Sequence, residues 1–225
     1  MRLLTLTIAA AAVFAVACED PAANKPKATT SAPTTNSANS SNVNANSNAA
    51  PTAVAAKGDA LAVTPENSKV EFTGSKVTGK HDGGFKEFTG TIDLVNGKAE
   101  ESSVSVDIDM ASVFTDADGL TDHLKNADFF EVAKFPKATF VSTKIVPDAA
   151  KGVGNYTVTG DFEIRGTKKS ITFPATITVS ESDVAVKSEF SINRKDFGIV
   201  YAGKADDLIR DDVVIKLDLK APRKK

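Results

Sequence analysis

Hydrophobic and polar residues alternate along most of the chain from residue 61 onward. In SSVSVDIDM, residues 102–110, a period of two places Val104, Val106 and Ile108 on one face and serine or aspartate on the other, which is typical of a half-buried β-strand. The same pattern recurs downstream, and the sequence predicts eight strands. They cover residues 69–78, 84–95, 102–110, 136–147, 156–164, 171–179, 184–192 and 213–219.

Turn-forming residues separate several of these strands, for example Asn96-Gly97 and Arg165-Gly166. Strands joined by such short turns are antiparallel. Most of the predicted strands are about ten residues long, against a usual length of about 5–6, and each is apolar on one side. Long, one-sided strands in a meander favour a closed up-and-down barrel over a sandwich, so the predicted fold class is all-β, an eight-stranded antiparallel β-barrel.

The inward faces of several predicted strands carry little side-chain volume. A barrel of this size is either filled by its own side chains or holds one small ligand. Small residues at five inward positions favour a cavity, although glycines in a barrel also relieve strain where strands bend. These positions are Gly74, Gly90, Gly160, Ala175 and Ser188.

One aromatic stretch, HLKNADFFEVAKFPKATF at residues 123–140, interrupts the alternation. Before it we expect a short helix around residues 120–126, with Asp116 or Asp118 as its N-cap. Pro136 then ends the irregular segment. The phenylalanines at 129, 130 and 135 therefore fall on a connection, which we expect to cover an open end of the barrel because exposed loops seldom carry three such residues.

The amino terminus predicts export. An apolar run from Leu3 to Ala17 has the length of a signal peptide, and Cys18, the single cysteine of the chain, follows it. The sequence FAVAC resembles the lipobox of bacterial lipoproteins, in which that cysteine carries lipid; Ala15-Val16-Ala17 also fits ordinary secretion. We expect a signal peptide at 1–17, a lipid-modified Cys18, and an envelope protein anchored to the outer membrane, because Glu19 is not the aspartate that retains some lipoproteins in the inner membrane.

The remaining chain divides into two parts. Residues 18–58 are rich in Ala, Ser, Asn, Thr and Pro and predict a disordered tether, which leaves residues 59–225 as the barrel domain. The net charge of −2 gives no indication of the strongly positive surface that binds nucleic acid. His81 and His123 have no ligand partners at metal-binding spacing, and no nucleophile stands beside a base. We therefore expect no metal, no cofactor and no catalysis; an unrecognised enzyme is the least favoured alternative.

Four stretches, in this order and at this spacing, resemble the sequence landmarks of YceI-like proteins. They are HLKNADFFEVAKFPKATFVSTKI, VTGDFEIRGTKKSITFPATI, FSINRKDFGI and LIRDDVVIKLDL. The resemblance covers about residues 62–221. It implies a lipocalin-like barrel of eight strands with one short helix, whose interior binds a polyisoprenoid or other long-chain lipid without catalysis. Candidate head-group contacts are Asp122, His123 and Arg194, although Thr121 stands where many relatives have arginine.

The inward register and the resemblance together predict a lipid-binding site inside the barrel. The alternative is a packed barrel that acts through its outer surface as an envelope stress or interaction protein. For either function the sequence leaves open whether the protein is a monomer or a dimer. The expected lining is Phe72, Phe88, Ile92, Val106, Ile108, Phe129, Phe130, Val158, Phe162, Phe173, Ile177, Phe190, Ile192 and Ile215.

Overall fold

The computed structural model describes residues 19–33 and 58–223. This part of the chain is mostly antiparallel sheet with one α-helix, α1 (Asp118–Leu124). The strands are β1 (Thr29–Ser31), β2 (Asp59–Val63), β3 (Lys69–Lys76), β4 (Gly79–Phe85), β5 (Phe88–Val95), β6 (Lys98–Asp109), β7 (Val113–Thr115), β8 (Lys137–Pro147), β9 (Asn155–Ile164), β10 (Thr167–Val179), β11 (Asp183–Asn193), β12 (Gly203–Lys204), β13 (Asp207–Leu208) and β14 (Asp212–Pro222). Short 3₁₀ helices are η1 (Met110–Ser112), η2 (Ala149–Lys151) and η3 (Arg194–Phe197).

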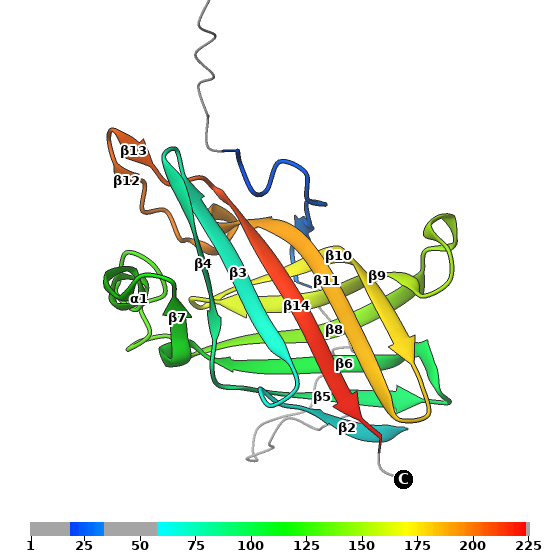
Figure 1. Ribbon diagram of the computed structural model, residues 1–225. Coiled ribbons are helices and arrows are strands. Elements are labelled where there is room, and N and C mark those ends of the chain that lie inside the picture. The colour runs from blue at the N-terminus through cyan, green and yellow to red at the C-terminus, as the bar shows by residue number, and fades with distance from the viewer. Residues whose placement is uncertain (1–18, 34–57, 224–225) are drawn as a thin grey trace, which may run out of the picture.

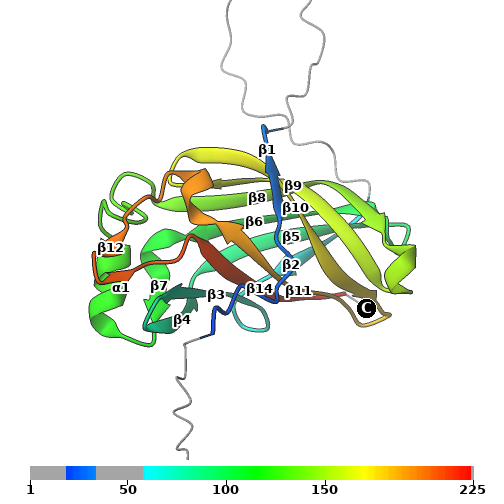
Figure 2. The same ribbon diagram turned by 90° about the horizontal axis from the view of Figure 1, so that it is seen from above.

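The main sheet is strongly curled. Its strands follow the order β2-β5-β6-β8-β9-β10-β11-β14-β3-β4-β7, so β3, β14 and β11 form one layer and β5, β6, β8 and β9 cross behind it (Figures 1 and 2). β2 pairs with β5 and β3 pairs with β14, and the two meet at a corner where the Lys220 N–H donates to Ser68 Oγ (2.9 Å). If β2 and β3 are counted as one bent strand, and β4 and β7 beyond β3 are left out, the wall has the predicted eight strands.

The alternation of hydrophobic and polar residues predicted most of the long strands correctly, because each of them has one face in the core. On β6, Val106 and Ile108 are buried while Ser105 and Asp107 are exposed. The predicted strand 84–95 is wrong, because a bend at residues 86–87 divides it into β4 and β5, which pair with different neighbours. The short strands β1, β2, β7, β12 and β13 were not predicted, since each has too few residues to show a period.

The predicted short helix is confirmed as α1, two residues earlier than expected, but its predicted cap is wrong. The N-cap residue is Ala117, which has no side-chain hydrogen bond to the helix. Asp118 lies in the first turn, and the Asp116 carboxylate instead lies 2.8 Å from Nδ1 of His81. The side chain of His81 on β4 thus contacts the carboxylate that the sequence assigned to the helix end.

The amino-terminal segment differs from the predicted tether. Residues 19–33 lie against the barrel, and β1 pairs with β10 (Figure 2). Ala22 and Ala28 are buried there, because small side chains let the backbone approach the sheet and form hydrogen bonds that composition does not reveal. The predicted signal peptide, Cys18 and residues 34–57 of the predicted tether lie outside the described residues.

Candidate functional site

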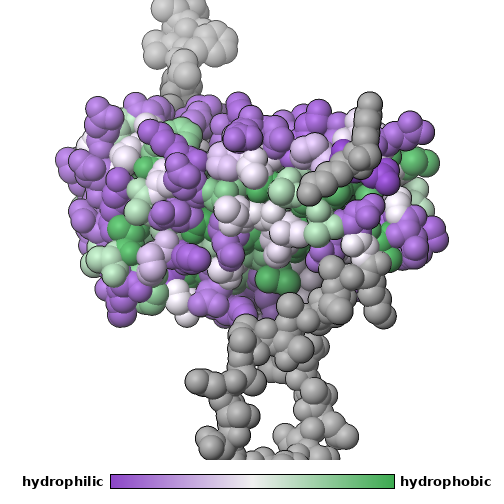
Figure 3. Space-filling view, turned by 90° about the horizontal axis from the view of Figure 1, so that it is seen from below, coloured by the Kyte–Doolittle hydropathy of each residue, from purple (hydrophilic) through white to green (hydrophobic). Residues whose placement is uncertain are grey.

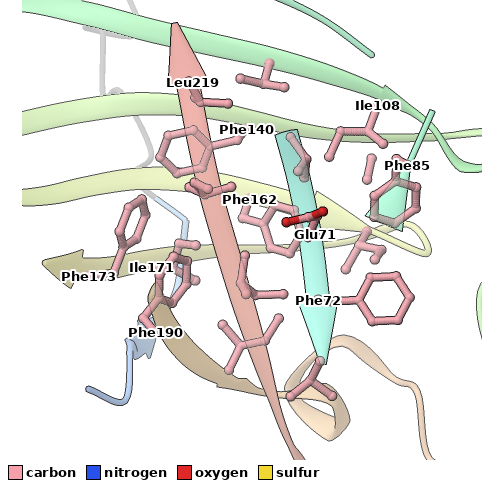
Figure 4. Close-up of a pocket in the computed structure, with 18 of the residues that line it drawn as sticks. Glu71, Phe72, Phe85, Ile108, Phe140, Phe162, Ile171, Phe173, Phe190 and Leu219 are labelled. Carbon is pink, nitrogen blue, oxygen red and sulfur yellow. The ribbon is translucent and has the colours of Figure 1, made fainter. Parts of the chain in front are cut away.

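A cavity of about 370 Å³ lies inside the curled sheet. Its lining is almost wholly apolar and comes from both layers of the sheet, from α1 and from the connection after α1. Figure 4 shows lining side chains from the two layers of the sheet. The volume falls within the range of about 300–1,000 Å³ that is usual for small-molecule sites. Hydrophilic residues cover much of the rim of the outer face seen in Figure 3, with hydrophobic residues grouped across its middle.

The structure places all but one of the predicted lining residues at this cavity. Phe88 is the exception: it is buried at the start of β5, beside the bend, and packs in the core without reaching the cavity. The residues that line the cavity as predicted are Phe72, Ile92, Val106, Ile108, Phe129, Phe130, Val158, Phe162, Phe173, Ile177, Phe190, Ile192 and Ile215.

Sequence reasoning missed several lining residues. Leu217 and Leu219 continue the alternation of Ile215 on β14, and Phe140 continues that of Ala138 on β8, so the register alone could have found them. Phe197 lies in η3, where no strand period applies. The residues that were missed include Val70, Phe85, Phe140, Phe197, Leu217 and Leu219.

The small inward residues explain less of the cavity than expected. Gly74 lines it, and a Cβ added there would meet nothing within 4 Å. A Cβ on Gly160 would lie 2.4 Å from the Phe140 ring, and one on Gly90 would lie 2.7 Å from the Ser105 carbonyl oxygen. These two glycines permit close approach of neighbours, and Ala175 and Ser188 do not line the cavity. Of the five, Gly74 alone contributes open space.

A row of phenyl rings lines one side of the cavity. Phe173 on β10 stacks on Phe190 of β11 with ring centroids 4.2 Å apart and planes 9° apart. Phe140 lies 5.7 Å from Phe173, and Phe162 meets Phe197 edge-on at 5.2 Å. Such rings offer a large apolar surface of fixed shape, since a phenyl side chain has few rotatable bonds.

The aromatic connection lies at the α1 end of the cavity, as predicted. Phe129 and Phe130 both line it. Phe129 is 6% exposed and meets the rings of His123 and Tyr201 at 5.0 and 5.4 Å. Phe135, the third phenylalanine of the stretch, does not line the cavity and packs against Gly166 instead.

Few polar groups border the cavity, and most of those at the α1 end are paired. Lys76 forms an ion pair with Asp207, and His81 contacts Asp116 at 2.8 Å. The hydrogen bond with His81 holds the pKa of the Asp116 carboxyl below its usual value. Glu71 on β3 also borders the cavity (Figure 4). The interior therefore suits an apolar chain, and most of the polar groups at the α1 end are engaged with other protein groups.

The three candidate head-group residues have different environments. Asp122 is exposed and does not line the cavity. His123 lies beside the cavity lining, with its ring between Phe129 and Tyr201 and its Nε2 2.8 Å from Asp128. Neither of them reaches the cavity, so the structure does not bring the three together.

Arg194 does line the cavity, but its guanidinium is already engaged. It donates to the carbonyl oxygens of Ile199 (2.7 Å), Ile209 (3.3 Å) and Arg210 (3.0 Å), and its Nη2 lies 3.4 Å from Asp211. Burial lowers the pKa of Arg194, which Asp211 partly opposes. The side chain thus holds the loop between η3 and β14 in place.

The described residues contain neither a candidate metal site nor a candidate membrane-spanning helix. Within residues 19–33 and 58–223, no three His, Cys, Asp or Glu side chains are grouped so that they could hold a metal ion. No helix in the same part of the chain is long and apolar enough to span a membrane.

Several known proteins are similar to this chain in sequence, in fold or in both. A UPF0312 protein of Pseudomonas putida (strain W619) is 33% identical over 142 residues, which cover 60% of this chain and 71% of that protein. Burkholderia cenocepacia BcnA superimposes with a TM-score of 0.63 at 28% identity, over 71% of this chain and 99% of that one. A polyisoprenoid-binding domain from Saccharophagus degradans gives a TM-score of 0.58 over 74% of this chain and all of that one; at 18% identity it shows the fold alone.

The family model of the YceI-like domain matches residues 61–221, which include every strand of the barrel wall from β2 to β14 except the first two residues of β2 and the last residue of β14. This match spans well over half of the sequence, and the chain belongs to the YceI-like domain family.

Proposed function

We propose that the barrel binds, stores or carries a long-chain isoprenoid or other long-chain lipid without catalysing a reaction. The observation that supports this most strongly is the apolar cavity inside the curled sheet, to which both layers contribute. The neighbouring domain from Saccharophagus degradans is named for polyisoprenoid binding, which supports the choice of ligand class. The cavity favours lipid binding over the alternative of a packed barrel that acts through its outer surface as an envelope stress or interaction protein.

Burial of an apolar chain supplies enough free energy for such binding. Each methylene transferred from water contributes about 0.8 kcal/mol, so a few isoprene units gain on the order of 10 kcal/mol before the costs of association. A charged head group is therefore not required. Selectivity would follow from the length and bends of the cavity, so several long-chain lipids would compete for it.

We further propose that the protein is exported and anchored in the bacterial outer membrane through a lipid on Cys18. The apolar run before Cys18 and the sequence FAVAC support this. Replacing Cys18 with alanine should release the protein from the membrane fraction of the producing cell, and unchanged fractionation of the Cys18→Ala variant would reject the anchor while leaving lipid binding untouched.

The binding function is tested by what the purified protein carries. Residues 19–225 should be purified without delipidation and extracted with organic solvent, and the extract analysed by mass spectrometry. Residues 19–33 belong in this protein because they form part of the wall. We expect a long-chain lipid at about one molecule per chain. An extract free of lipid, from a folded protein that also fails to take up added isoprenoid alcohol, would overturn the proposal.

A further inference from the structure

The wall of the barrel is split between β10 and β11. These strands pair from Thr176–Lys187 to Val179–Val184 and no further. Before Thr176, β10 continues beside β9, and after Lys187, β11 continues beside β14. Pro174 lies two residues before Thr176, where the pairing ends. It has no N–H to donate to a neighbouring strand, and its carbonyl oxygen accepts a hydrogen bond from Ser188 Oγ (2.5 Å).

Residues 26–31 fill this split. β1 runs antiparallel to β10, with Thr29 opposite Thr172, and Lys27 forms a parallel bridge to Ser191 on β11. The Ala28 N–H donates to the Ser191 carbonyl oxygen (2.8 Å), and the Ser191 N–H donates to the Pro26 carbonyl oxygen (2.9 Å). The segment therefore satisfies backbone groups of both separated strands, as a strand of the wall does.

The side chains of this segment also alternate like those of a wall strand. Ala28 is 6% exposed and belongs to the apolar core, whereas Lys27 and Thr29 on either side are exposed. Exposed ion pairs hold it from outside, from Lys25 to Glu189 (2.8 Å) and from Lys27 to Asp212. We call residues 26–31 the seam strand.

Cavity-lining side chains lie directly behind the seam strand. The stacked rings of Phe173 and Phe190 face each other across the split, and Ile171 and Ile192 flank them. All four line the cavity. The seam strand and one pair of phenyl rings therefore separate the cavity from solvent at this point.

The seam strand is attached more weakly than any long strand of the wall. It contributes three register pairs to β10, whereas β11 and β14 are joined by eleven. Its ion pairs are exposed, and exposed pairs contribute little to stability. Short, exposed strands of this kind open locally at a small fraction of the free energy of global unfolding.

We propose that the seam strand is a detachable part of the wall and that the split beneath it is the side entrance of the cavity, through which a long-chain lipid enters and leaves. This rests on the lipid-binding function proposed above. When the seam strand leaves, rotation of Phe173 or Phe190 opens the apolar interior without breaking any pairing between the long strands.

A disulfide across the seam tests the proposal. In the full chain carrying Cys18→Ala, Thr29→Cys and Thr172→Cys introduce two cysteines at directly opposite positions of an antiparallel pair. Such positions have Cα atoms about 4.5–5.5 Å apart, within the range for a disulfide. Uptake and release of a fluorescent farnesyl alcohol are measured in the oxidised and the reduced protein, so that the reduced state controls for folding.

The matched control introduces a disulfide between β11 and β14, where the two strands are paired without interruption. Lys187→Cys and Asp218→Cys join exposed partners on β11 and β14. We expect oxidation of the seam pair to slow uptake and release at least tenfold with an unchanged amount bound at equilibrium, and oxidation of the control pair to change neither rate. Equal rates in oxidised and reduced seam variants would overturn the side entrance alone. Absence of binding in every variant and in the parent chain would overturn the lipid-binding function and, with it, the entrance.

Discussion

Gly74 is the residue at which the volume of the cavity depends on a missing side chain. Because a Cβ there meets nothing within 4 Å, Gly74→Leu should add its side chain to the cavity without a clash in the wall. We expect binding of a fluorescent isoprenoid alcohol to weaken at least tenfold, while the free energy of unfolding changes by less than about 0.5 kcal/mol.

The matched control for this change is Gly79→Leu in the same hairpin. Gly79 also has no atom within 4 Å of an added Cβ, but it lies outside the cavity lining. The control should bind the probe like the parent protein. Equal affinities for Gly74→Leu and Gly79→Leu would place the ligand elsewhere.

Asp82 on β4 gives the fold a dependence on acid pH. A hydrogen bond from Thr73, with the charges of Lys216 and Lys80, holds the pKa of Asp82 below its ordinary value of 3.8, although burial acts in the opposite direction. A carboxyl with a lowered folded pKa contributes stability that is complete above the ordinary value and lost as pH falls through the folded pKa. Asp82 therefore stabilises the protein at neutral pH and not in strong acid.

The corresponding variant is Asp82→Asn, compared with the parent by urea unfolding. At about pH 6 we expect it to be less stable by no more than about 1 kcal/mol, because the side chain is half exposed and screened by water. At about pH 2.5, below the ordinary pKa of an aspartate, the difference in stability between the two proteins should be smaller than at pH 6. Asp107→Asn on the exposed face of β6 should match the parent at both pH values, and a constant deficit for Asp82→Asn at both would contradict the assignment.

In the connection between α1 and β8, two adjacent phenylalanines differ in burial and should therefore differ in their contribution to stability. Phe129 is buried among His123 and Tyr201, while Phe130 is half-buried and lies 6.3 Å from Phe85. Truncation of a buried phenylalanine costs about 3–5 kcal/mol. We expect Phe129→Ala to fall in that range and Phe130→Ala clearly below it, as measured by denaturant unfolding; a larger loss for Phe130→Ala would refute this division.

At the scale of elements, the sequence predicted the long strands, whose alternation follows from having one face in the core. It missed the features that depend on which strands become neighbours. β6, β9, β10, β11 and β14 alternate because one face of each is buried, so their inward residues could be read directly as cavity lining. Gly160 was misread because its neighbour Phe140 comes from a different strand and fills the space. The bend at residues 86–87 was missed because its cause is a change of pairing partners.

At the scale of the whole molecule, the largest difference from the sequence prediction is the place of residues 19–33. Low hydrophobicity predicted a tether from Cys18 to the barrel, but a strand can join a sheet through backbone hydrogen bonds that side-chain composition does not report. The chain next to Cys18 is therefore bound to the barrel, with Asp20 3.4 Å from Arg210. An anchor at Cys18 would hold the barrel wall itself, and no long spacer would precede it.

Deletion of residues 19–33 should consequently destabilise the whole barrel. It leaves backbone groups of β10 and β11 without partners and exposes apolar surface at the split, a loss of about 2–4 kcal/mol if each net hydrogen bond contributes about 1 kcal/mol. For a domain of this size that lowers the melting temperature by about 4–16 °C. Exposed strand edges also pair with other chains, so the deleted protein should form dimers or aggregates on size-exclusion chromatography.

The control keeps residues 19–33 and replaces residues 34–57 by a Gly-Ser sequence of equal length. Since the low hydrophobicity of residues 34–57 predicts little burial, we expect the melting temperature and the elution volume of this variant to match the parent. A deletion of residues 19–33 that melts like the parent would show that the wall closes without them. The measurement thus separates a structural strand from a spacer within a stretch that composition alone describes as uniform.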